Sequence, residues 1–383
     1  MAYAEGRTYY DADSHLMETS DWLTTYADPD VRERLRPLGL GQAGPLADQA
    51  VATADARRAN PTADPNADAE LMARKGWSAL GAFDATERSH ALDLLGFERQ
   101  LVFTTFAPTQ FLDGDPDLLY GGTTAHNRAI ADFCGHDDRL IAIGFVPLDV
   151  PERAAAAADE AIALGCGAVL VPSAPPATHS PTHPDMDPLW ARLQEAGVPF
   201  MLHVGGGGRL VPPAFHANGR PRPTDFLGGG ENIRSKDYMA MYHPPETFLA
   251  AMVLDGVFER FPGLRAGCIE QGGMWVVPLL RRLDLAQYTF AKTEPLLSEL
   301  SLKPSEYLRR QVTFTPFPTE PVGWMIEQAG PDLFCFSSDY PHPEGGRDPL
   351  RRFEASLDGI AEAAKERFYS GNFAEMMGIA VPA

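Results

Sequence analysis

The sequence is poor in basic residues relative to acidic ones. Its 383 residues include 32 Lys and Arg against 52 Asp and Glu, which gives a formal net charge of −20. This excess of negative charge argues against nucleic acid and anionic membrane surfaces as partners, because both repel it. A small-molecule carboxylate remains an acceptable substrate, since a metal ion or an arginine can reverse the field inside a pocket.

Cysteine is scarce, and long apolar runs are absent. The four cysteines, at positions 134, 166, 268 and 335, are far apart and lie in apolar stretches such as LGCGAVLV and LFCFSS. Their spacing fits neither a zinc site nor a redox dithiol, so we expect buried free thiols. No run reaches transmembrane length, and the first residues lack a basic-then-apolar signal region. These absences predict a cytoplasmic protein.

What the chain does contain is an alternation of short apolar runs with longer helical patterns. The strand candidates are residues 7–13, 99–106, 140–148, 167–173, 199–205, 264–270, 312–316 and 333–339. Apolar strands that alternate with helices indicate a parallel sheet covered on both faces. Eight such units predict an α/β fold, a (β/α)8 TIM barrel formed as one domain by residues 1–383. An open doubly wound sheet is the alternative, disfavoured because no Gly-rich phosphate turn follows the first strand.

Two segments interrupt this alternation. Residues 37–95 form an insertion between the first and second strands, and residues 37–70 within it are rich in Ala, Asp and Pro. We expect that part to be exposed. Residues 205–243 form a long glycine-rich loop after the fifth strand. On a barrel this loop lies over the carboxyl ends of the strands, so we expect an active-site lid with glycine hinges.

Side chains that can bind a metal follow four of the predicted strands. The first strand leads to Asp13 and His15, which point to the same side because side chains alternate in extended chain. The fifth strand contains His203, the sixth ends in Glu270 and the eighth ends in Asp339. Polar residues at the carboxyl ends of barrel strands are typical of a catalytic face.

Imidazole and carboxylate together suit Zn²⁺, Mn²⁺ or Fe²⁺ better than Ca²⁺, which prefers oxygen ligands alone. Taken singly, a strand-end histidine is usually a satisfied polar group and an aspartate before Tyr-Pro is usually a turn former. The coincidence of four such residues is the stronger signal. We expect Asp11 and Glu18, in contrast, to be solvated or capping groups.

Three motifs resemble those of a known family. DADSHLME at residues 11–18, MLHVG at 201–205 and FSSDYPHPEG at 336–345 are similar to the amidohydrolase superfamily. They are most similar to its amidohydrolase-related branch, which contains aminocarboxymuconate semialdehyde decarboxylase and γ-resorcylate decarboxylase. The resemblance extends from about residue 7 to the C-terminal helix. It implies a (β/α)8 barrel, often dimeric in relatives, that holds one divalent ion, zinc in the first place or manganese.

The resemblance also implies the ligands of that ion. The usual first-strand motif is His-x-His, and the sequence resembles the variant in which an acidic residue replaces the first His. The implied metal ligands are Asp13, His15, His203 and Asp339.

One position departs from the family pattern. Many relatives carry a histidine after the sixth strand, where this chain has Glu270 and Gln271 in CIEQGG. His243 and His342 are the candidates to replace that histidine. Arg282 is a candidate partner for a second substrate carboxylate, with a solvated helix charge as the alternative interpretation.

Three functions remain open at this stage. In a non-oxidative decarboxylase, a buried Asp339 would supply the proton that replaces CO2, since desolvation raises a carboxyl pKa. In a hydrolase, Asp339 would act on metal-activated water and Glu270 would orient the substrate or accept a proton. A non-catalytic binding barrel is disfavoured because all four ligand positions hold competent residues. The family resemblance favours a decarboxylase acting on a small aromatic or conjugated carboxylic acid.

Overall fold

The computed structural model describes residues 2–40, 44–112, 114–208, 211–221 and 234–380. Its centre is a sheet in which every strand pair is parallel. The strand order is β1-β3-β4-β5-β6-β7-β8, with β2 also paired to β3. The strands are β1 Tyr10–Asp11, β2 His15–Leu16, β3 Arg99–Thr104, β4 Leu140–Phe145, β5 Ala168–Leu170, β6 Phe200–His203, β7 Ala266–Ile269 and β8 Val312–Phe314.

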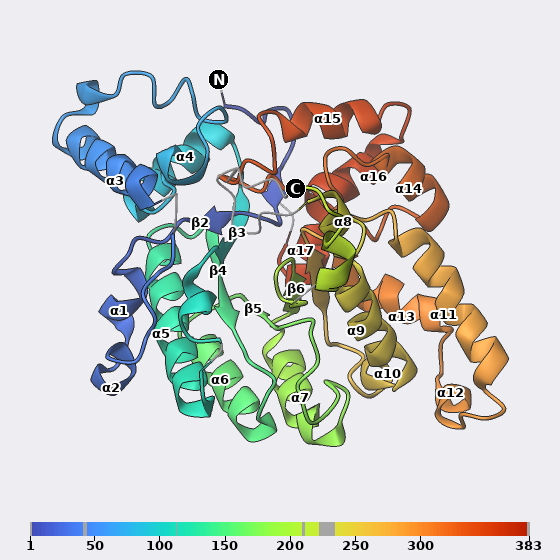
Figure 1. Cartoon of the computed structure of the whole chain (residues 1–383). Coiled ribbons are helices and arrows are strands. Elements are labelled where there is room, and N and C mark those ends of the chain that lie inside the picture. Colours follow the sequence, from blue (N-terminus) through green and yellow to red (C-terminus); the bar gives the residue numbers. More distant parts are fainter. Residues whose placement is uncertain (1, 41–43, 113, 209–210, 222–233, 381–383) are drawn as a thin grey trace.

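The helices lie around this sheet (Figure 1). The α-helices are α1 Trp22–Tyr26, α2 Pro29–Arg32, α3 Gly44–Ala59, α4 Ala85–Leu95, α5 Pro116–Cys134, α6 Pro151–Ala163, α7 Asp187–Ala196, α8 Ser235–Tyr238, α9 His243–Leu254, α10 Val257–Arg260, α11 Val276–Phe290, α12 Leu296–Glu299, α13 Pro304–Gln311, α14 Val322–Ala329, α15 Pro349–Ser356, α16 Glu362–Glu366 and α17 Asn372–Met377. Shorter turns are η2 Pro61–Ala63, η3 Gly76–Ser78, η4 Ala107–Gln110, η5 Pro184–Met186, η6 Pro213–His216 and the π-helical η7 Arg367–Gly371. A parallel sheet covered by helices confirms the predicted α/β class.

Of the predicted first strand, residues 7–13, only β1 is a regular strand; a separate short strand, β2, follows at His15–Leu16, and both pair with β3. Between them the backbone N–H of Ala12 donates to the carbonyl of Phe336, 3.1 Å away, instead of to β3. The chain there turns toward residues 333–340, and this turn places the Asp13 and His15 side chains at the end of the sheet.

The predicted eighth strand is an irregular segment rather than a regular strand. It makes two isolated bridges, from Phe334 to Phe314 on one side and from Tyr340 to Ser14 on the other. Two of its amides are diverted: Phe336 N–H donates to the Phe368 carbonyl, and Ser338 N–H donates to the Asp11 carboxylate. Other backbone hydrogen bonds still join it to both neighbours: Cys335 N–H donates to the Phe314 carbonyl, and His15 N–H donates to the Tyr340 carbonyl. The segment therefore links β8 to the first strand.

The two segments that interrupt the alternation contain short elements of their own. Residues 37–95 include α3, η2, η3 and α4, and only Ala47 and Ala54 of α3 are buried. Of the predicted lid, residues 205–243, the structure describes η6 and α8, whereas residues 209–210 and 222–233 lie outside the described part.

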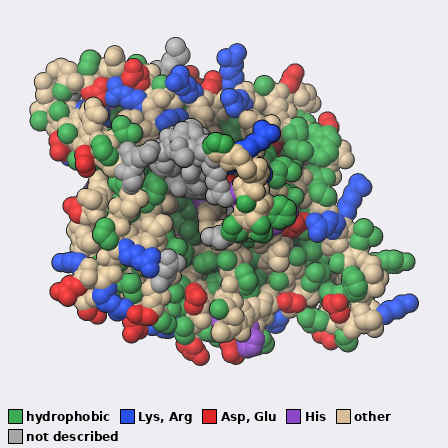
Figure 2. All heavy atoms as spheres, in the orientation of Figure 1, with side chains coloured by type: hydrophobic (Ala, Val, Ile, Leu, Met, Phe, Trp, Pro, Cys, Tyr) green, Lys and Arg blue, Asp and Glu red, His purple; other side chains and the backbone are tan. Residues whose placement is uncertain are grey.

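Three features predicted or suggested by the composition can be compared with the structure: the cysteines, the apolar helices and the surface charge. All four cysteines are free and buried, as predicted. None of the helices in the described ranges combines the length and apolar character needed to span a bilayer. On the face seen in Figure 2, acidic and basic side chains are interspersed around the periphery, so the net negative charge is not gathered in one patch there.

Candidate metal centre

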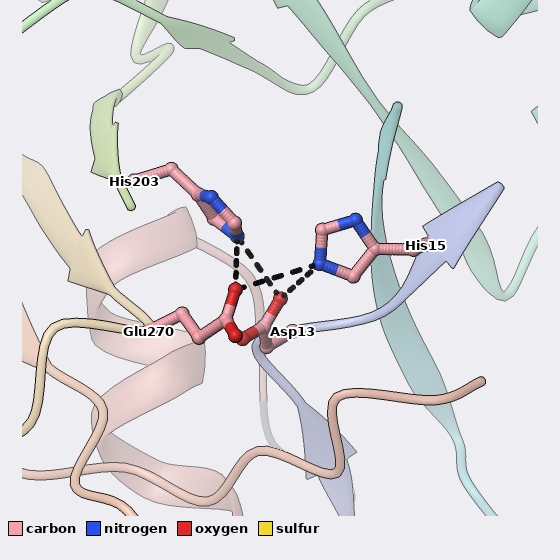
Figure 3. A group of neighbouring side chains, drawn as sticks. All are labelled: Asp13, His15, His203 and Glu270. Carbon is pink, nitrogen blue, oxygen red and sulfur yellow. Dashed lines mark hydrogen bonds and ion pairs between the residues drawn. The ribbon is translucent and has the colours of Figure 1, made fainter. Parts of the chain in front are cut away.

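Six titratable side chains converge where β2 begins and where β6, β7 and the segment 333–340 end, and all six are buried: Asp13, His15, His203, Glu270, Asp339 and His342. Figure 3 shows four of them, with the rings of His15 and His203 directed at the carboxylates of Asp13 and Glu270. Segments distant in sequence thus bring imidazoles and carboxylates together in one buried place.

The four residues of Figure 3 form a compact set of donor atoms. His203 Nε2 lies 3.4 Å from Asp13 Oδ1 and 3.4 Å from Glu270 Oε2. His15 Nε2 lies 3.3 Å from Asp13 Oδ1 and 3.9 Å from Glu270 Oε2. Each residue offers one donor atom within 4.8 Å of the others. Ligands held at about 2.0–2.2 Å from one ion are separated by roughly 3–4 Å, so the set fits a divalent cation.

Asp339 and His342 belong to a second group that shares His15 and Glu270 with the first. Asp339 Oδ1 lies 3.1 Å from His342 Nδ1 and 3.5 Å from His15 Nε2. The His342 ring stacks on the His15 ring with centroids 3.8 Å apart, and its Nε2 lies 3.0 Å from Thr105 Oγ1. Three of the four predicted ligands therefore meet Glu270 in one group, and Asp339 joins the neighbouring group.

The electrostatics of the cluster suit a cation. Burial lowers the pKa of His15 to about 3, assisted by the charge of His342, so the imidazole is neutral and has a lone pair to donate. Burial alone would raise the pKa of Asp13, but hydrogen bonds from His15 and His203 hold that pKa well below its usual range. Burial raises the pKa of Asp339 to about 7, although His342 opposes the shift. Within the described residues, Asp13 Oδ2 and Asp339 Oδ2 are buried without a hydrogen-bond partner, as expected of oxygens meant for an ion or a ligand.

Two of the acidic residues, Glu270 and Asp339, have an unusual backbone conformation. Glu270 and Asp339 both have φ of +53°, and among the described residues they are the only ones other than glycine with positive φ. The Glu270 N–H donates to Thr315 Oγ1 at 2.8 Å, and the Asp339 N–H donates to the Asp13 carbonyl at 2.9 Å. Such conformations cost about 1–3 kcal/mol and cluster at functional sites, which supports a role for both side chains.

The expectation that Asp11 and Glu18 are solvated is wrong, because both are fully buried, whereas Glu18 does accept the first N–H of η4, as a capping group would. The Asp11 carboxylate accepts hydrogen bonds from the Ser338 N–H, the Ser338 hydroxyl and the Gln100 amide at 2.6–2.8 Å. Asp11 thereby ties the residue before Asp339 to the strand that precedes Asp13. The alternation of side chains could have indicated this, since Asp11 and Asp13 are two residues apart.

Glu18 acts on another neighbouring segment. Its carboxylate accepts the N–H groups of Thr105, Phe106 and Ala107 at 2.9–3.0 Å, where β3 leads into η4. These donors are nearly ninety residues away in sequence, so no local sequence pattern could predict these hydrogen bonds.

The structure does not bring two other candidates to the cluster. His243 is exposed at the start of α9, where its ring contacts Tyr242. The Arg282 side chain on α11 is 65% exposed and pairs with Glu246. Arg282 therefore has the position of the solvated helix charge that was its alternative interpretation.

A small cavity of about 20 Å³ lies against the cluster, and its walls include Asp13, Glu270, Thr315 and Asp339. This volume is enough for about one water molecule. This cavity, walled by described residues, is therefore of the size of one small group such as a water molecule.

Comparison with known proteins identifies the family. The family model for amidohydrolases matches residues 10–379. A 2-amino-3-carboxymuconate-6-semialdehyde decarboxylase of Dictyostelium discoideum is 24% identical over 207 residues, 51% of this chain and 49% of that protein. The match thus spans about half the length of that relative.

Solved structures share the fold over nearly the whole chain. An amidohydrolase from Mycobacterium avium subsp. paratuberculosis K-10 has a TM-score of 0.75 and 25% identity, covering 98% of this chain and 100% of that one. A 5-carboxyvanillate decarboxylase from Novosphingobium aromaticivorans DSM 12444, complexed with manganese and 4-hydroxy-3-methoxy-5-nitrobenzoic acid, has a TM-score of 0.63 and 18% identity, covering 98% and 97%.

Proposed function

The chain belongs to the amidohydrolase family, and from this premise we propose that it is a metal-dependent, non-oxidative decarboxylase of a small aromatic or conjugated carboxylic acid. The observation that carries the proposal is the buried group of Asp13, His15, His203 and Glu270, with a carboxyl–imidazole pair beside it. The relatives named as decarboxylases support the reaction type. In this proposal the sheet and the segment 333–340 together make the complete (β/α)8 barrel.

The metal of this proposal is one divalent ion. Asp13, His15, His203 and Glu270 would hold it, with Asp339 at its open side. When bound, the ion supplies a Lewis acid that attracts the acidic oxygens of the substrate. Three carboxylates against two imidazoles favour Mn²⁺ over the Zn²⁺ expected from the sequence, because carboxylate oxygen suits Mn²⁺ well. Manganese is also the ion in the related 5-carboxyvanillate decarboxylase.

The proton would come from Asp339. Decarboxylation breaks the bond between the substrate carbon and its carboxyl group, releases CO2 and leaves the electron pair on that carbon. One proton must then reach the same carbon. Asp339 is buried, and its Oδ1 lies 3.1 Å from Nδ1 of His342. The other ring nitrogen of His342, Nε2, is hydrogen-bonded to the Thr105 hydroxyl. This pair can hold a proton away from water and renew it after each turnover.

The proposal is tested by incubating manganese-loaded protein with 5-carboxyvanillate and other aromatic acids in D2O. We expect release of CO2 and a product with deuterium at the vacated carbon. Asp339→Asn should lower kcat by at least about 100-fold, the usual contribution of a positioned proton donor. Asp358→Asn, an exposed aspartate, is the control.

Two outcomes would contradict the proposal. A product heavier than the substrate by one water would replace it with the hydrolase alternative. Full turnover in protein stripped of metal by a chelator would show that the reaction does not need the ion.

A further inference from the structure

A larger pocket lies between α3 and η3. We call it the α3 pocket; it has a volume of about 430 Å³ and is lined by Leu46, Gln49, Ala50, Thr53, Arg57, Arg74, Lys75, Gly76, Trp77 and Ser78. This volume falls in the range of small-molecule sites, in contrast to the cavity of about 20 Å³ at the metal ligands. The α3 pocket therefore has space for an aromatic ring.

The pocket wall includes a rigid aromatic plane. The Trp77 ring stacks on Phe106 with centroids 5.4 Å apart and an interplanar angle of 2°, and its Nε1 donates to the Glu18 carbonyl at 3.0 Å. Trp77 is thus fixed by the same Glu18 segment that orders the end of β3. A flat, preformed apolar wall suits a planar ligand.

Lys75 has an unusual environment in this wall. Its Nζ is buried and has no hydrogen-bond partner within the described part of the chain. The two arginines of the pocket are already engaged, Arg57 with Glu87 and Arg74 with Asp64. Burial lowers the pKa of Lys75 to about 8, although the carboxylates of Asp339 and Glu344 oppose the shift. A buried ammonium group without an acceptor costs stability, which is expected where a ligand supplies the acceptor.

Lys75 lines the pocket and also interacts with an acid of the metal cluster. The N–H of Gly76 donates to the carbonyl of Pro341 at 2.9 Å, which fixes η3 against the turn between Asp339 and His342. The charge of Lys75 interacts with Asp339, the acid at the open side of the cluster.

The charge balance of the cluster makes such a cation useful. The carboxylates of Asp13 and Glu270 neutralise an ion of charge +2, and an ionised Asp339 would make the centre negative. An anionic substrate would then gain little long-range attraction from the metal centre. A nearby ammonium group supplies the attraction that is missing.

We propose that Lys75 is a substrate-binding residue whose ammonium group takes an acidic oxygen of an aromatic acid lodged in the α3 pocket. The inference rests on the proposed function for the class of ligand, and it adds where and by which residue the ligand is held.

The test measures binding of 4-hydroxy-3-methoxy-5-nitrobenzoate to manganese-loaded protein by calorimetry. Lys75→Met keeps the apolar stem and removes the charge; we expect its Kd to rise by about 10–100-fold, the value of a charge-assisted hydrogen bond. Lys75→Arg should recover much of the affinity. Lys365→Met, which changes a surface lysine paired with Glu362, should bind as the wild type does.

Two further readouts separate binding from a structural role. Lys75→Met should unfold at the same temperature as the wild type or a higher one, because it removes an unsatisfied buried charge, and its affinity for Mn²⁺ should be unchanged. A structural lysine would instead lower the unfolding temperature on replacement.

The outcomes also separate this inference from the proposed reaction. Binding that depends on Lys75 without CO2 release would uphold the inference and reject the decarboxylase. Equal Kd and equal kcat/KM in the wild type and Lys75→Met would reject the inference and leave the decarboxylase standing. Absence of any binding by the wild type at millimolar ligand would overturn the inference as well.

Discussion

Glu270 occupies the position at which this chain departs from the family pattern, after the sixth predicted strand. Its carboxylate reaches the donor atoms of His15 and His203, and its backbone is held at φ of +53°. A histidine there would be neutral, whereas a glutamate adds a negative charge and an oxygen ligand. The residue thus changes both the charge and the hardness of the site.

This leads to a prediction about metal affinity. Glu270→Gln should weaken Mn²⁺ binding by at least about 10–100-fold, since even loss of an indirect metal contact has that effect. Glu270→His should recover binding but shift the preference toward Zn²⁺. Calorimetric titration of chelator-treated protein measures both, with the exposed Glu327→Gln as control. Unchanged Mn²⁺ affinity in Glu270→Gln would exclude Glu270 as a ligand.

At the scale of elements, buried polar side chains connect strands to the turns beside them. Glu18 receives three consecutive backbone N–H groups where β3 ends, and Asp11 connects β1 with Ser338. Such connections satisfy amides that no strand partner can take, because the sheet ends there. The short, irregular strands around the site are consequently held by side chains as well as by the ladder.

Replacing Glu18 tests this connection. Glu18→Gln retains one acceptor oxygen and turns an NH2 group toward backbone donors, so the free energy of unfolding should fall by about 1–3 kcal/mol. Urea denaturation of the metal-free protein measures the change. The exposed Glu33→Gln should leave the midpoint unaltered. A Glu18→Gln midpoint equal to that of the wild type would show that these hydrogen bonds contribute nothing net.

A second prediction at this scale concerns His126 on α5. Its ring is buried between Thr104 Oγ1 and Asn127 Oδ1, each 2.9 Å away, and burial lowers its pKa to about 4. Because the folded pKa lies below the unfolded one, the protein gains stability from neutral His126 above about pH 6.5 and loses it as the pH falls toward 4.

The loss attributable to His126 should reach about 2 kcal/mol between about pH 7.5 and pH 5. Urea denaturation at both pH values, compared with His126→Asn, measures it. The variant, which has no titrating ring at this position, should show a correspondingly smaller decrease. Parallel pH profiles would contradict the prediction.

At the scale of the whole molecule, the candidate metal centre joins segments near the two ends of the chain. Asp13 and Asp339 are more than three hundred residues apart, yet the Asp339 N–H donates to the Asp13 carbonyl. His203 and Glu270 reach the same point from β6 and the end of β7. An ion bound there links segments from all parts of the sheet, and the same set of ligands does not exist in the unfolded chain.

Metal removal should therefore lower global stability. At Mn²⁺ concentrations about 1,000 times Kd, the free energy of unfolding should rise by about 4 kcal/mol over that of the chelated protein. Thermal and urea denaturation measure the difference. His203→Ala should show little stabilisation by Mn²⁺, and His136→Gln, an exposed histidine, should respond as the wild type does. Equal stabilisation of His203→Ala would place the ion elsewhere.

The sequence alone determined most of the succession of strands and helices, though not that residues 333–339 are irregular, because apolar periodicity and Gly or Pro breaks depend on neighbouring residues. It also indicated the common orientation of Asp13 and His15, a consequence of local side-chain alternation. Only the tertiary structure decided that Glu270 joins these residues and that Asp11 and Glu18 are buried. It alone also showed that Lys75, beside the α3 pocket, has no hydrogen-bond partner among the described residues. These features depend on register and on hydrogen-bond partners tens to hundreds of residues away, which no local pattern encodes.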